Sequence, residues 1–277
     1  MTPISIMING LPGNMARILA ETALADPRFT VLPYSLTGPE IQQLRLRVGD
    51  QDFQLISPGT RDDAIKSLID EHGTFISVDY THPSAVNDNC SFYCRRNLPF
   101  VMGTTGGDRR ALQHAVEHSP CSAVIAPNMA KQIVGFQAMM QYAARNFPGL
   151  FRGYAMELRE SHQQGKADTS GTAKAMVAHF NDLGIDFATE DIVKERNPEH
   201  QRDSLGVPGE HLTGHAWHTY TLSSADGTVR FEFTHNVNGR LIYTQGTLDA
   251  VVFLRQRVAE GSQGQVFSMI DVIGKPN

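Results

Sequence analysis

The sequence has few cysteines, no long apolar run and no internal repeat, and each absence excludes a class of protein. Its three cysteines are Cys90, Cys94 and Cys121, and so small and odd a number gives no disulfide framework and predicts a reducing compartment. No apolar segment approaches the ~20 residues that cross a membrane. A strand expected to begin by Ile4 leaves no room for a signal or transit peptide.

An excess of positive charge is also missing. The 277 residues include 24 Lys and Arg against 29 Asp and Glu, a formal net charge of -5. We therefore expect no nucleic-acid partner and no anionic membrane held by bulk electrostatics, and any anion site must be local. With 41% hydrophobic residues, a chain of this length is long enough to form two domains.

The first half of the chain alternates short apolar runs with helical segments. The expected strands are residues 4–8, 29–35, 53–56, 75–80, 100–102 and 123–126. Apolar strands separated by helices predict an α/β fold, here a Rossmann-like, doubly wound parallel sheet covered on both faces. Ligands of such sheets bind beyond the carboxyl ends of the strands.

Three turn-rich segments follow those strands, at residues 10–15, 79–83 and 103–107. In the first, Gly10 and Gly13 precede a helical stretch, which lets the backbone approach a pyrophosphate at a helix N-terminus. The match to the dinucleotide fingerprint is partial, because Ala16 stands where a third glycine is usual, and a turn that binds no phosphate is the alternative. The convergence of the three segments favours a dinucleotide site.

The second half reads as an α+β domain with a mostly antiparallel sheet. A helix is expected at 128–147, with a Met-rich stripe typical of a core, and a polar loop at 195–213. The expected strands are residues 153–158, 214–222, 229–236 and 239–243, the middle pair joined as a hairpin.

A helix at 247–258 and a strand at 266–272 complete the chain. We expect both to return to the first domain, because the sheet of the second half is complete without them. The predicted domains are residues 1–128 with 241–277 for the dinucleotide, and 129–240 for substrate binding and oligomerisation.

The densest stretch of chemistry runs from residue 160 to residue 173. His162 can deliver a proton near neutral pH, Lys166 adds a positive charge, and Ser170 is the predicted N-cap of a helix. The amides of Gly171 and Thr172 in the first turn would attract an anion. These groups suit a carboxylate-bearing substrate that is protonated as it reacts, although most junctions of this composition do nothing chemical.

No metal site is predicted. Cys90 and Cys94 are four residues apart on a predicted helix, but no second pair follows at zinc spacing, so buried thiols are expected. His215 and His218 are three apart on a predicted strand and therefore point to opposite faces. We interpret them, with His211 and His235, as hydrogen-bonded strand histidines.

Nearly the whole chain resembles the dihydrodipicolinate reductase family. The resemblance is carried by Glu160-Ser161-His162, by the run from Lys166 to Ala173, by Gly103-Thr104-Thr105-Gly106 and by the turn at 10–15. The family's bacterial form has two adjacent histidines and a proline before the serine. Gln163 and Thr169 stand at those positions, as in the plant-type branch, which the segments at 126–132 and 206–216 also resemble.

The resemblance implies reduction of 4-hydroxy-tetrahydrodipicolinate to tetrahydrodipicolinate, with NADPH or NADH, in lysine and diaminopimelate biosynthesis. It implies His162 as proton donor and Lys166 as its cationic partner. The predicted antiparallel sheet suggests an assembly surface, so we expect a homo-oligomer, dimeric or tetrameric. Substrate would be held by Gln163, Lys166, Ser170, Gly171 and Thr172. Cofactor would be held by Gly10, Gly13, Asn14, Met15, Ser35, Thr37, Tyr80, Gly103, Thr104, Thr105, Ala126, Pro127, Asn128 and Met129.

We also predict which nicotinamide cofactor the protein prefers and in which cellular compartment it works. No acid stands between Pro33 and Gly38, where a fold selective for NADH usually carries one. Ser35 and Thr37 are candidates to bind a 2′-phosphate, so NADPH is expected to be modestly preferred. We expect the cytoplasm, or the plastid stroma in a photosynthetic source.

Two other functions are open at this point. One is another two-domain nicotinamide oxidoreductase that acts on a carboxylate, such as an amino-acid or semialdehyde dehydrogenase, which would not need Lys166. The other is a non-catalytic NADPH sensor, which would bind the cofactor yet tolerate the loss of His162.

Overall fold

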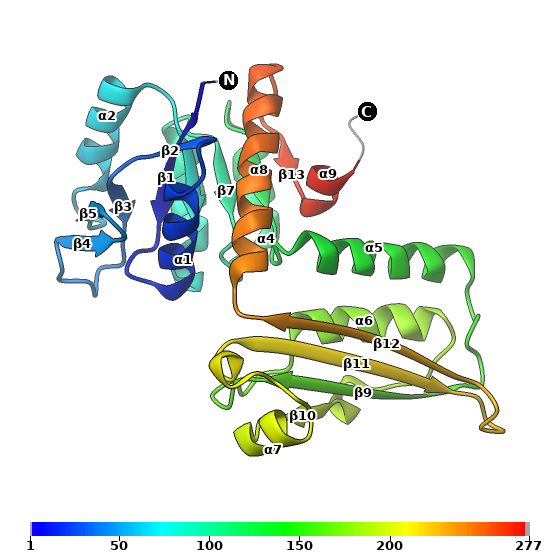
Figure 1. Ribbon diagram of the computed structural model, residues 1–277. Helices are drawn as coiled ribbons and strands as arrows, with labels where there is room; N and C mark the ends of the chain where they lie inside the picture. The colour runs from blue at the N-terminus through cyan, green and yellow to red at the C-terminus, as the bar shows by residue number, and fades with distance from the viewer. Residues whose placement is uncertain (1, 275–277) are drawn as a thin grey trace. The chain divides into compact units, whose positions relative to one another are not determined.

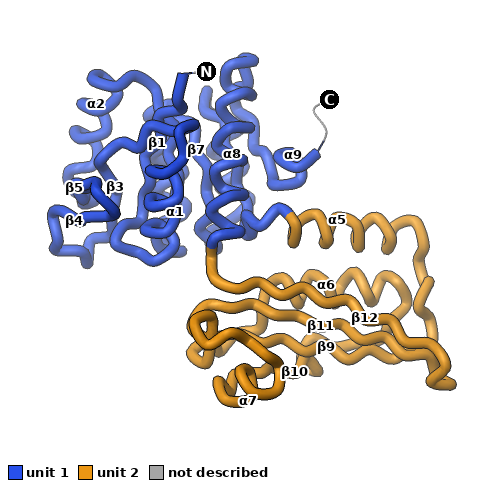
Figure 2. The backbone as a smooth tube through the Cα atoms, in the orientation of Figure 1, with its two compact units in different colours: residues 1–131, 241–277 blue, residues 132–240 orange. Residues whose placement is uncertain are grey.

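The computed structural model describes residues 2–274 and divides into two compact units (Figures 1 and 2). Unit 1 comprises residues 1–131 and 241–277, and unit 2 comprises residues 132–240. Within the described residues, no helix has both the length and the apolar character needed to cross a membrane.

Unit 1 is built on a parallel sheet of six strands in the order β13-β8-β7-β6-β1-β2. The strands are β1 (Ile4–Asn9), β2 (Phe29–Val31), β6 (Ile76–Asp79), β7 (Phe100–Met102), β8 (Ala123–Ile125) and β13 (Val266–Phe267). The side chains of Ile6, Ile8, Val78 and Val101 are fully buried, as expected for strands covered on both faces. The predicted Rossmann-like fold class is confirmed.

Helices cover both faces of this sheet. They are α1 (Asn14–Leu24), α2 (Arg61–His72), α3 (Val86–Arg95), α4 (Arg109–Glu117) and α8 (Leu241–Ala259). Helix α8 packs on α1 and on strands β6, β7 and β8, whereas α3 packs on α4. Gly246 allows α8 its close approach, because a Cβ there would lie 1.7 Å from the carbonyl oxygen of Met129.

A second, three-stranded sheet interrupts the expected order. The predicted strand at 29–35 is wrong as a single element: it is divided at Pro33 into β2 and β3 (Tyr34–Leu36), which belong to different sheets. Proline lacks the N–H that would continue the ladder. Strand β5 (Gln51–Ile56) pairs in parallel with β3 and antiparallel with β4 (Arg45–Val48), a strand that the sequence analysis missed.

Unit 2 is a four-stranded sheet in the order β10-β9-β11-β12. The strands are β9 (Ala155–His162), β10 (Val193–Glu195), β11 (His215–Ser223) and β12 (Arg230–Asn238). Only the β9–β10 pairing is parallel, so the sheet is mixed and mostly antiparallel. Helices α5 (Lys131–Asn146) and α6 (Gly171–Asp182) bury Met140, Met176 and Phe180 with Tyr220 of the sheet.

Three predicted elements differ from the structure. Residues 239–243 are not a strand: β12 ends at Asn238, opposite the first residue of β11. One further backbone bond joins Gly239 to Gly214, and helix α8 then begins at Leu241. Residues 266–272 form the short β13 followed by helix α9 (Met269–Ile273). The expected loop at 195–213 contains helix α7 (Pro198–Asp203) and a 3-10 turn at Gly209–His211.

Candidate active site

The turn between β1 and α1 is compact because it contains two glycines. Gly10 has a φ of 110°, and a Cβ on it would lie 2.2 Å from the carbonyl oxygen of Tyr80. The Gly13 amide donates to the Gly10 carbonyl at 2.8 Å. Any larger residue at Gly10 would force the turn away from the neighbouring strand end.

Helix α1 begins directly after this turn with its first amides uncapped by any side chain. Gly13 and Asn14 are exposed, and Met15 is half-buried in the first turn. A helix start with free amides and no acidic residue in its first turn favours an anion. This geometry suits a phosphate group.

The strand ends next to β1 lie against each other through backbone contacts. The Gly103 amide donates to the Asp79 carbonyl at 3.0 Å, and Ala126 does the same to Met102 at 3.1 Å. A Cβ on Gly103 would lie 2.4 Å from the Tyr80 ring. The loops after β1, β6, β7 and β8 thus stand side by side at one edge of the sheet, the edge where such folds bind nucleotides.

The predicted cofactor residues of these loops are not equally accessible. Thr105 is exposed and Asn128 half-buried, whereas Thr104 and Met129 are buried. The Thr104 hydroxyl donates to Asp79 Oδ1 at 2.8 Å, and the Tyr80 hydroxyl shares a 2.6 Å hydrogen bond with Thr247. Ala126 is buried and Pro127 exposed. Thr105 and Pro127 are therefore the exposed residues that this edge offers to a ligand.

Ser35 and Thr37 are not free to grip a phosphate with their hydroxyls. Ser35 is fully buried, and its Oγ accepts from the Leu11 amide at 3.2 Å and donates to Leu36. Thr37 is also buried and donates to the Leu11 carbonyl at 2.8 Å. Both hydroxyls stabilise the Gly10 turn. The sequence could not reveal this, because both partners depend on how β3 meets that turn.

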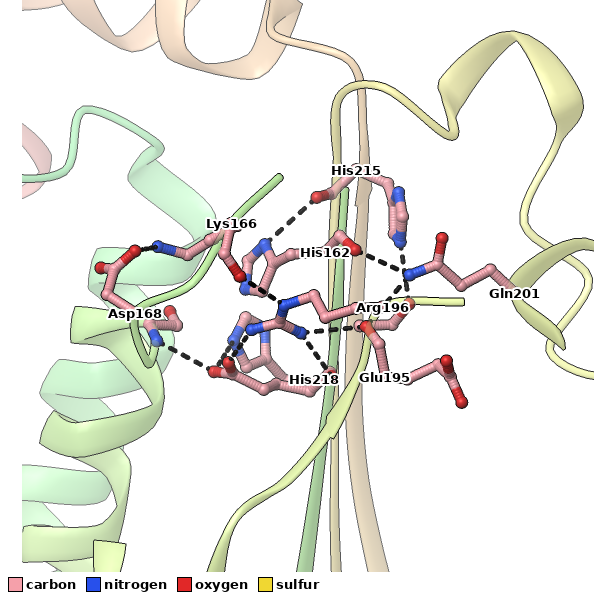
Figure 3. Close-up of polar contacts among 11 residues, drawn as sticks. His162, Lys166, Asp168, Glu195, Arg196, Gln201, His215 and His218 are labelled. Carbon is pink, nitrogen blue, oxygen red and sulfur yellow. Dashed lines mark hydrogen bonds and ion pairs between the residues drawn. The ribbon is translucent and has the colours of Figure 1, made fainter. Parts of the chain in front are cut away.

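The second group of predicted residues lies in unit 2, between β9 and α6 (Figure 3). His162 is the last residue of β9 and is buried. Its Nδ1 donates to the His215 carbonyl at 3.2 Å, while its Nε2 is buried without a hydrogen-bond partner. The bond at Nδ1 fixes the ring and leaves Nε2 as the atom available for proton transfer.

The pKa of His162 is lowered to about 4, chiefly because burial penalises the imidazolium. The carboxylate of Glu160 opposes this fall in the pKa, and the positive charges of Arg196 and Lys166 add to it. Since the value lies below the ordinary 6.5, His162 is neutral at pH 7 while no ligand is bound.

Two further histidines stand behind His162, of which His218 is buried and His235 half-buried. The His218 ring lies 5.1 Å from the His162 ring and 4.7 Å from the His235 ring, measured between centroids. Burial lowers the pKa of His218 well below its ordinary value and that of His235 to about 4. In His215, by contrast, both ring nitrogens have hydrogen-bond partners. Its Nε2 accepts a 2.8 Å hydrogen bond from the Ser161 hydroxyl and so orients it, and its Nδ1 donates to the His211 carbonyl.

The loop after β9 carries Lys166. Its ammonium donates to Asp168 Oδ1 at 2.7 Å, and Asp168 is 75% exposed. Gln163 is half-buried and accepts the Lys166 amide with its backbone carbonyl at 3.0 Å. Lys166 is itself half-buried, whereas its partner Asp168 is screened by solvent.

Helix α6 begins at Gly171 after the N-cap Ser170, as the sequence predicts. The Ser170 side chain makes no capping bond, so the first-turn amides of Gly171 and Thr172 are not occupied by it. Gly171 is exposed and Thr172 half-buried. Free amides at a helix start attract a carboxylate, as the ammonium of Lys166 does.

Glu160, His162 and His218 each offer a buried ligand atom within 4.8 Å of the others. Arg196 already pairs with the Glu160 carboxylate, and Lys166 adds a second positive charge close enough to lower the pKa of both histidines. One anion against two cations favours an anionic ligand over a metal ion.

Three supporting residues were missed by the sequence analysis. Arg196 and Gln201 come from the segment expected to be a loop, and Gln201 Nε2 donates to the His162 carbonyl at 2.7 Å. Asp79 accepts from Thr81, Thr104, Asn89 and Tyr93 at the end of β6. The one available signal was a charged residue in each buried strand, Glu160 in β9 and Asp79 in β6.

Comparison with known proteins gives the same family in both halves of the chain. The model "Dihydrodipicolinate reductase, N-terminus" matches residues 4–129, and "Dihydrodipicolinate reductase, C-terminus" matches residues 133–273. A rice protein (Oryza sativa subsp. japonica) named probable 4-hydroxy-tetrahydrodipicolinate reductase 2, chloroplastic, is 45% identical over 268 residues, 97% of this chain and 82% of its own. An Arabidopsis thaliana relative, reductase 1, chloroplastic, is 43% identical over 99% of this chain and 79% of its own.

Solved structures agree on the fold. A dipicolinate-bound dihydrodipicolinate reductase from Paenisporosarcina sp. TG-14 superposes with a TM-score of 0.68 at 18% identity, covering 99% of this chain and all of the other. An engineered D-amino acid dehydrogenase bound to NADP+ gives 0.51 at 12% identity, covering 100% of this chain and 97% of the other.

Proposed function

The chain belongs to the dihydrodipicolinate reductase family, and from this premise we propose how its own residues carry out the reaction. Members of the family reduce 4-hydroxy-tetrahydrodipicolinate with a nicotinamide cofactor, and this chain is such an oxidoreductase in lysine biosynthesis. The observation that carries the assignment of roles is one loop, 162–172, which combines a proton donor, a cation and a free helix start.

The substrate is a ring with two carboxylates, and unit 2 offers two anion-binding features. Lys166 gives a point charge, and the amides of Gly171 and Thr172 give directed donors at the positive end of α6. Gln163, half-buried beside His162, stands where the bacterial form has its second histidine and is proposed as a neutral substrate contact. Ser170 positions the two amides rather than contributing its hydroxyl.

The reaction also needs a proton donor next to the bound dicarboxylate substrate. The substrate must lose its 4-hydroxyl group as water, which leaves an unsaturated ring. A bound nicotinamide would supply a hydride to that ring, and a proton from His162 Nε2 would neutralise the negative charge left on it. His162 is neutral without ligand, so it must gain its proton when substrate arrives. Two carboxylates beside a buried imidazole favour the imidazolium, so substrate binding itself raises the pKa of His162.

The assay that tests this function follows nicotinamide absorbance after addition of freshly generated pathway substrate. We expect absorbance loss that requires both substrate and protein. Oxidation of the cofactor only with a different acid would point to another dehydrogenase, and binding of NADPH without turnover of any dicarboxylate would point to a sensor.

For the cofactor we propose NADPH, with NADH also used. The support is the Gly10 turn with the free start of α1 for the pyrophosphate, and the lack of an acid directly after β3. The loops after β6, β7 and β8, with Tyr80, Thr105 and Asn128, are proposed to border the nicotinamide. Because Ser35 and Thr37 are occupied by backbone, no side chain there grips a 2′-phosphate and the preference is small.

Glu40 provides a specific test of the cofactor proposal. It is exposed, and its carboxylate folds back onto Gly38, two residues after β3, so that a Cβ on that glycine would lie 2.3 Å from it. A carboxylate here repels a 2′-phosphate and accepts a ribose hydroxyl, which is a second reason why the proposed preference for NADPH is small. Glu40→Gln should therefore raise NADPH affinity several-fold and leave NADH affinity unchanged or slightly lower. Fluorescence titrations with both cofactors measure this, and wild-type protein that binds NADH clearly tighter than NADPH contradicts the proposed preference.

We also propose a homo-oligomer, dimeric or tetrameric, formed through unit 2. One face of its sheet is covered by α5 and α6, whereas the other lines an open groove with Trp217, Thr219 and Thr234. Sedimentation velocity of the purified chain tests this. Because the plant relatives are named chloroplastic, the proposed location is the plastid stroma in a photosynthetic source, and the cytoplasm otherwise.

A further inference from the structure

Glu160 presents an electrostatic conflict within the proposed substrate site. It lies on β9 two residues before His162, and its side chain is 0% exposed. Its Oε2 accepts the amide of Ser170 at 3.0 Å, one residue before the amides proposed to bind a substrate carboxylate. A buried negative charge so close to an anion site opposes the ligand unless it is neutralised.

Arg196 neutralises it from a distant part of the chain. This residue follows β10, its side chain is 17% exposed, and its Nη2 pairs with Glu160 Oε1. Its Nη1 donates to the carbonyls of Glu160 at 3.3 Å and Glu195 at 2.9 Å. Its Nε donates to the carbonyl of Lys166 at 2.9 Å. Figure 3 shows the guanidinium at the centre of these contacts.

These bonds fix three points of the substrate loop at once. Glu160 is held at the strand, Lys166 at the middle of the loop through its backbone, and Ser170 at the helix start through the Glu160 carboxylate. The planar fork of an arginine is suited to several acceptors in fixed directions, which a lysine cannot reproduce. Each of the three nitrogens of the Arg196 guanidinium donates within the protein, and together these bonds use four of its five N–H groups.

We propose that Arg196 is a positioning residue for substrate binding, which balances the buried Glu160 carboxylate and anchors the Lys166–Ser170 loop through it. This inference rests on the proposed function of that loop as the dicarboxylate site. It goes further in assigning a substrate-affinity role to a pair of residues that touch no substrate. The site therefore favours an anion only while the charge of Glu160 is balanced or absent.

The test is a double-mutant cycle on Arg196→Met, Glu160→Gln and the two together. Pyridine-2,6-dicarboxylate affinity is measured by calorimetry, alongside KM, kcat and NADPH affinity. Arg196→Met leaves the buried carboxylate unpaired, and we expect dicarboxylate affinity to fall roughly 10- to 100-fold, with KM rising more than kcat falls. NADPH affinity should stay unchanged, because the cofactor loops belong to unit 1.

The double variant separates electrostatics from simple loss of structure. Glu160→Gln keeps an acceptor for the Ser170 amide and removes the charge, so adding it to Arg196→Met should restore part of the lost affinity. Arg196→Lys keeps the charge without the fork and should lie between wild type and Arg196→Met. Arg202→Met, an exposed arginine paired with Asp203 on α7, is the matched control and should change nothing.

Three outcomes overturn the inference. They are wild-type dicarboxylate affinity in Arg196→Met, a double variant that binds no better than Arg196→Met, and equal loss of NADPH affinity. If Arg196→Met does not fold, the dicarboxylate affinities of Arg196→Lys and of the double variant are compared with wild type, and the same criteria apply. Failure of the proposed function looks different, since wild-type protein would then bind no dicarboxylate at all.

Discussion

His162→Ala lowers turnover by roughly 10²–10⁴-fold and leaves NADPH affinity nearly unchanged. His162 Nε2 is the one titratable atom in the 162–172 loop that is both buried and without a partner among the described residues. General acid catalysis by a positioned group contributes a factor of this size. The cofactor site is untouched, because its loops lie in unit 1.

A second substitution distinguishes proton transfer from packing. His162→Gln retains a side-chain amide that can donate to the His215 carbonyl but cannot deliver a proton. The same loss of kcat is therefore expected in both variants, measured by cofactor oxidation at saturating substrate. Turnover near wild type in either variant removes His162 from the mechanism.

The depressed pKa of His162 adds a signature that a structural histidine lacks. With a pKa of about 4, the ring of His162 is neutral in the free protein at pH 7, with its one proton on Nδ1 and none on Nε2, and a bound dicarboxylate raises the pKa. Binding of pyridine-2,6-dicarboxylate should then take up a fraction of a proton, detected as a calorimetric heat that depends on the ionisation enthalpy of the buffer. The dependence should disappear in His162→Gln, and its persistence would assign the uptake to another group.

Lys166→Ala weakens transition-state binding by roughly 2–5 kcal/mol, the cost of losing one member of a charge-assisted contact in a closed site. The effect should appear in kcat/KM and in the affinity for pyridine-2,6-dicarboxylate, a planar mimic of the product ring that competes with substrate. Lys166→Arg should rescue only partly, because the planar fork does not replace a point charge in a short loop.

The structure provides a matched variant for this prediction. Without ligand, the Lys166 ammonium pairs with exposed Asp168, so a substrate carboxylate must replace or share that partner. Asp168→Asn should therefore raise dicarboxylate affinity slightly while Lys166→Ala lowers it, and NADPH affinity should be unaffected in both. Equal dicarboxylate affinity in wild type and Lys166→Ala means that Lys166 is a surface lysine and the substrate site lies elsewhere.

The sequence predicted local features well and pairings poorly. The start of α6 after Ser170 and the apolar parallel strands follow from residues close together in the chain, and both are confirmed. The strand expected at 239–243 was wrong because strand formation depends on a partner strand, and β11 begins at His215, opposite Asn238. Pro33 divided another expected strand between two sheets, which no periodicity reveals.

By itself the sequence determined the fold class, the family and the stretch in which a proton donor, a cation and a helix start follow one another. These depend on short-range order, because a strand, a loop and a helix start within fourteen residues must be close in space. Tertiary structure alone decided the state of that site. Arg196 reaches Glu160 across 36 positions, burial makes His162 neutral, and the Gly10 turn occupies the hydroxyls of Ser35 and Thr37, since charge balance and solvent access depend on residues that only folding brings together.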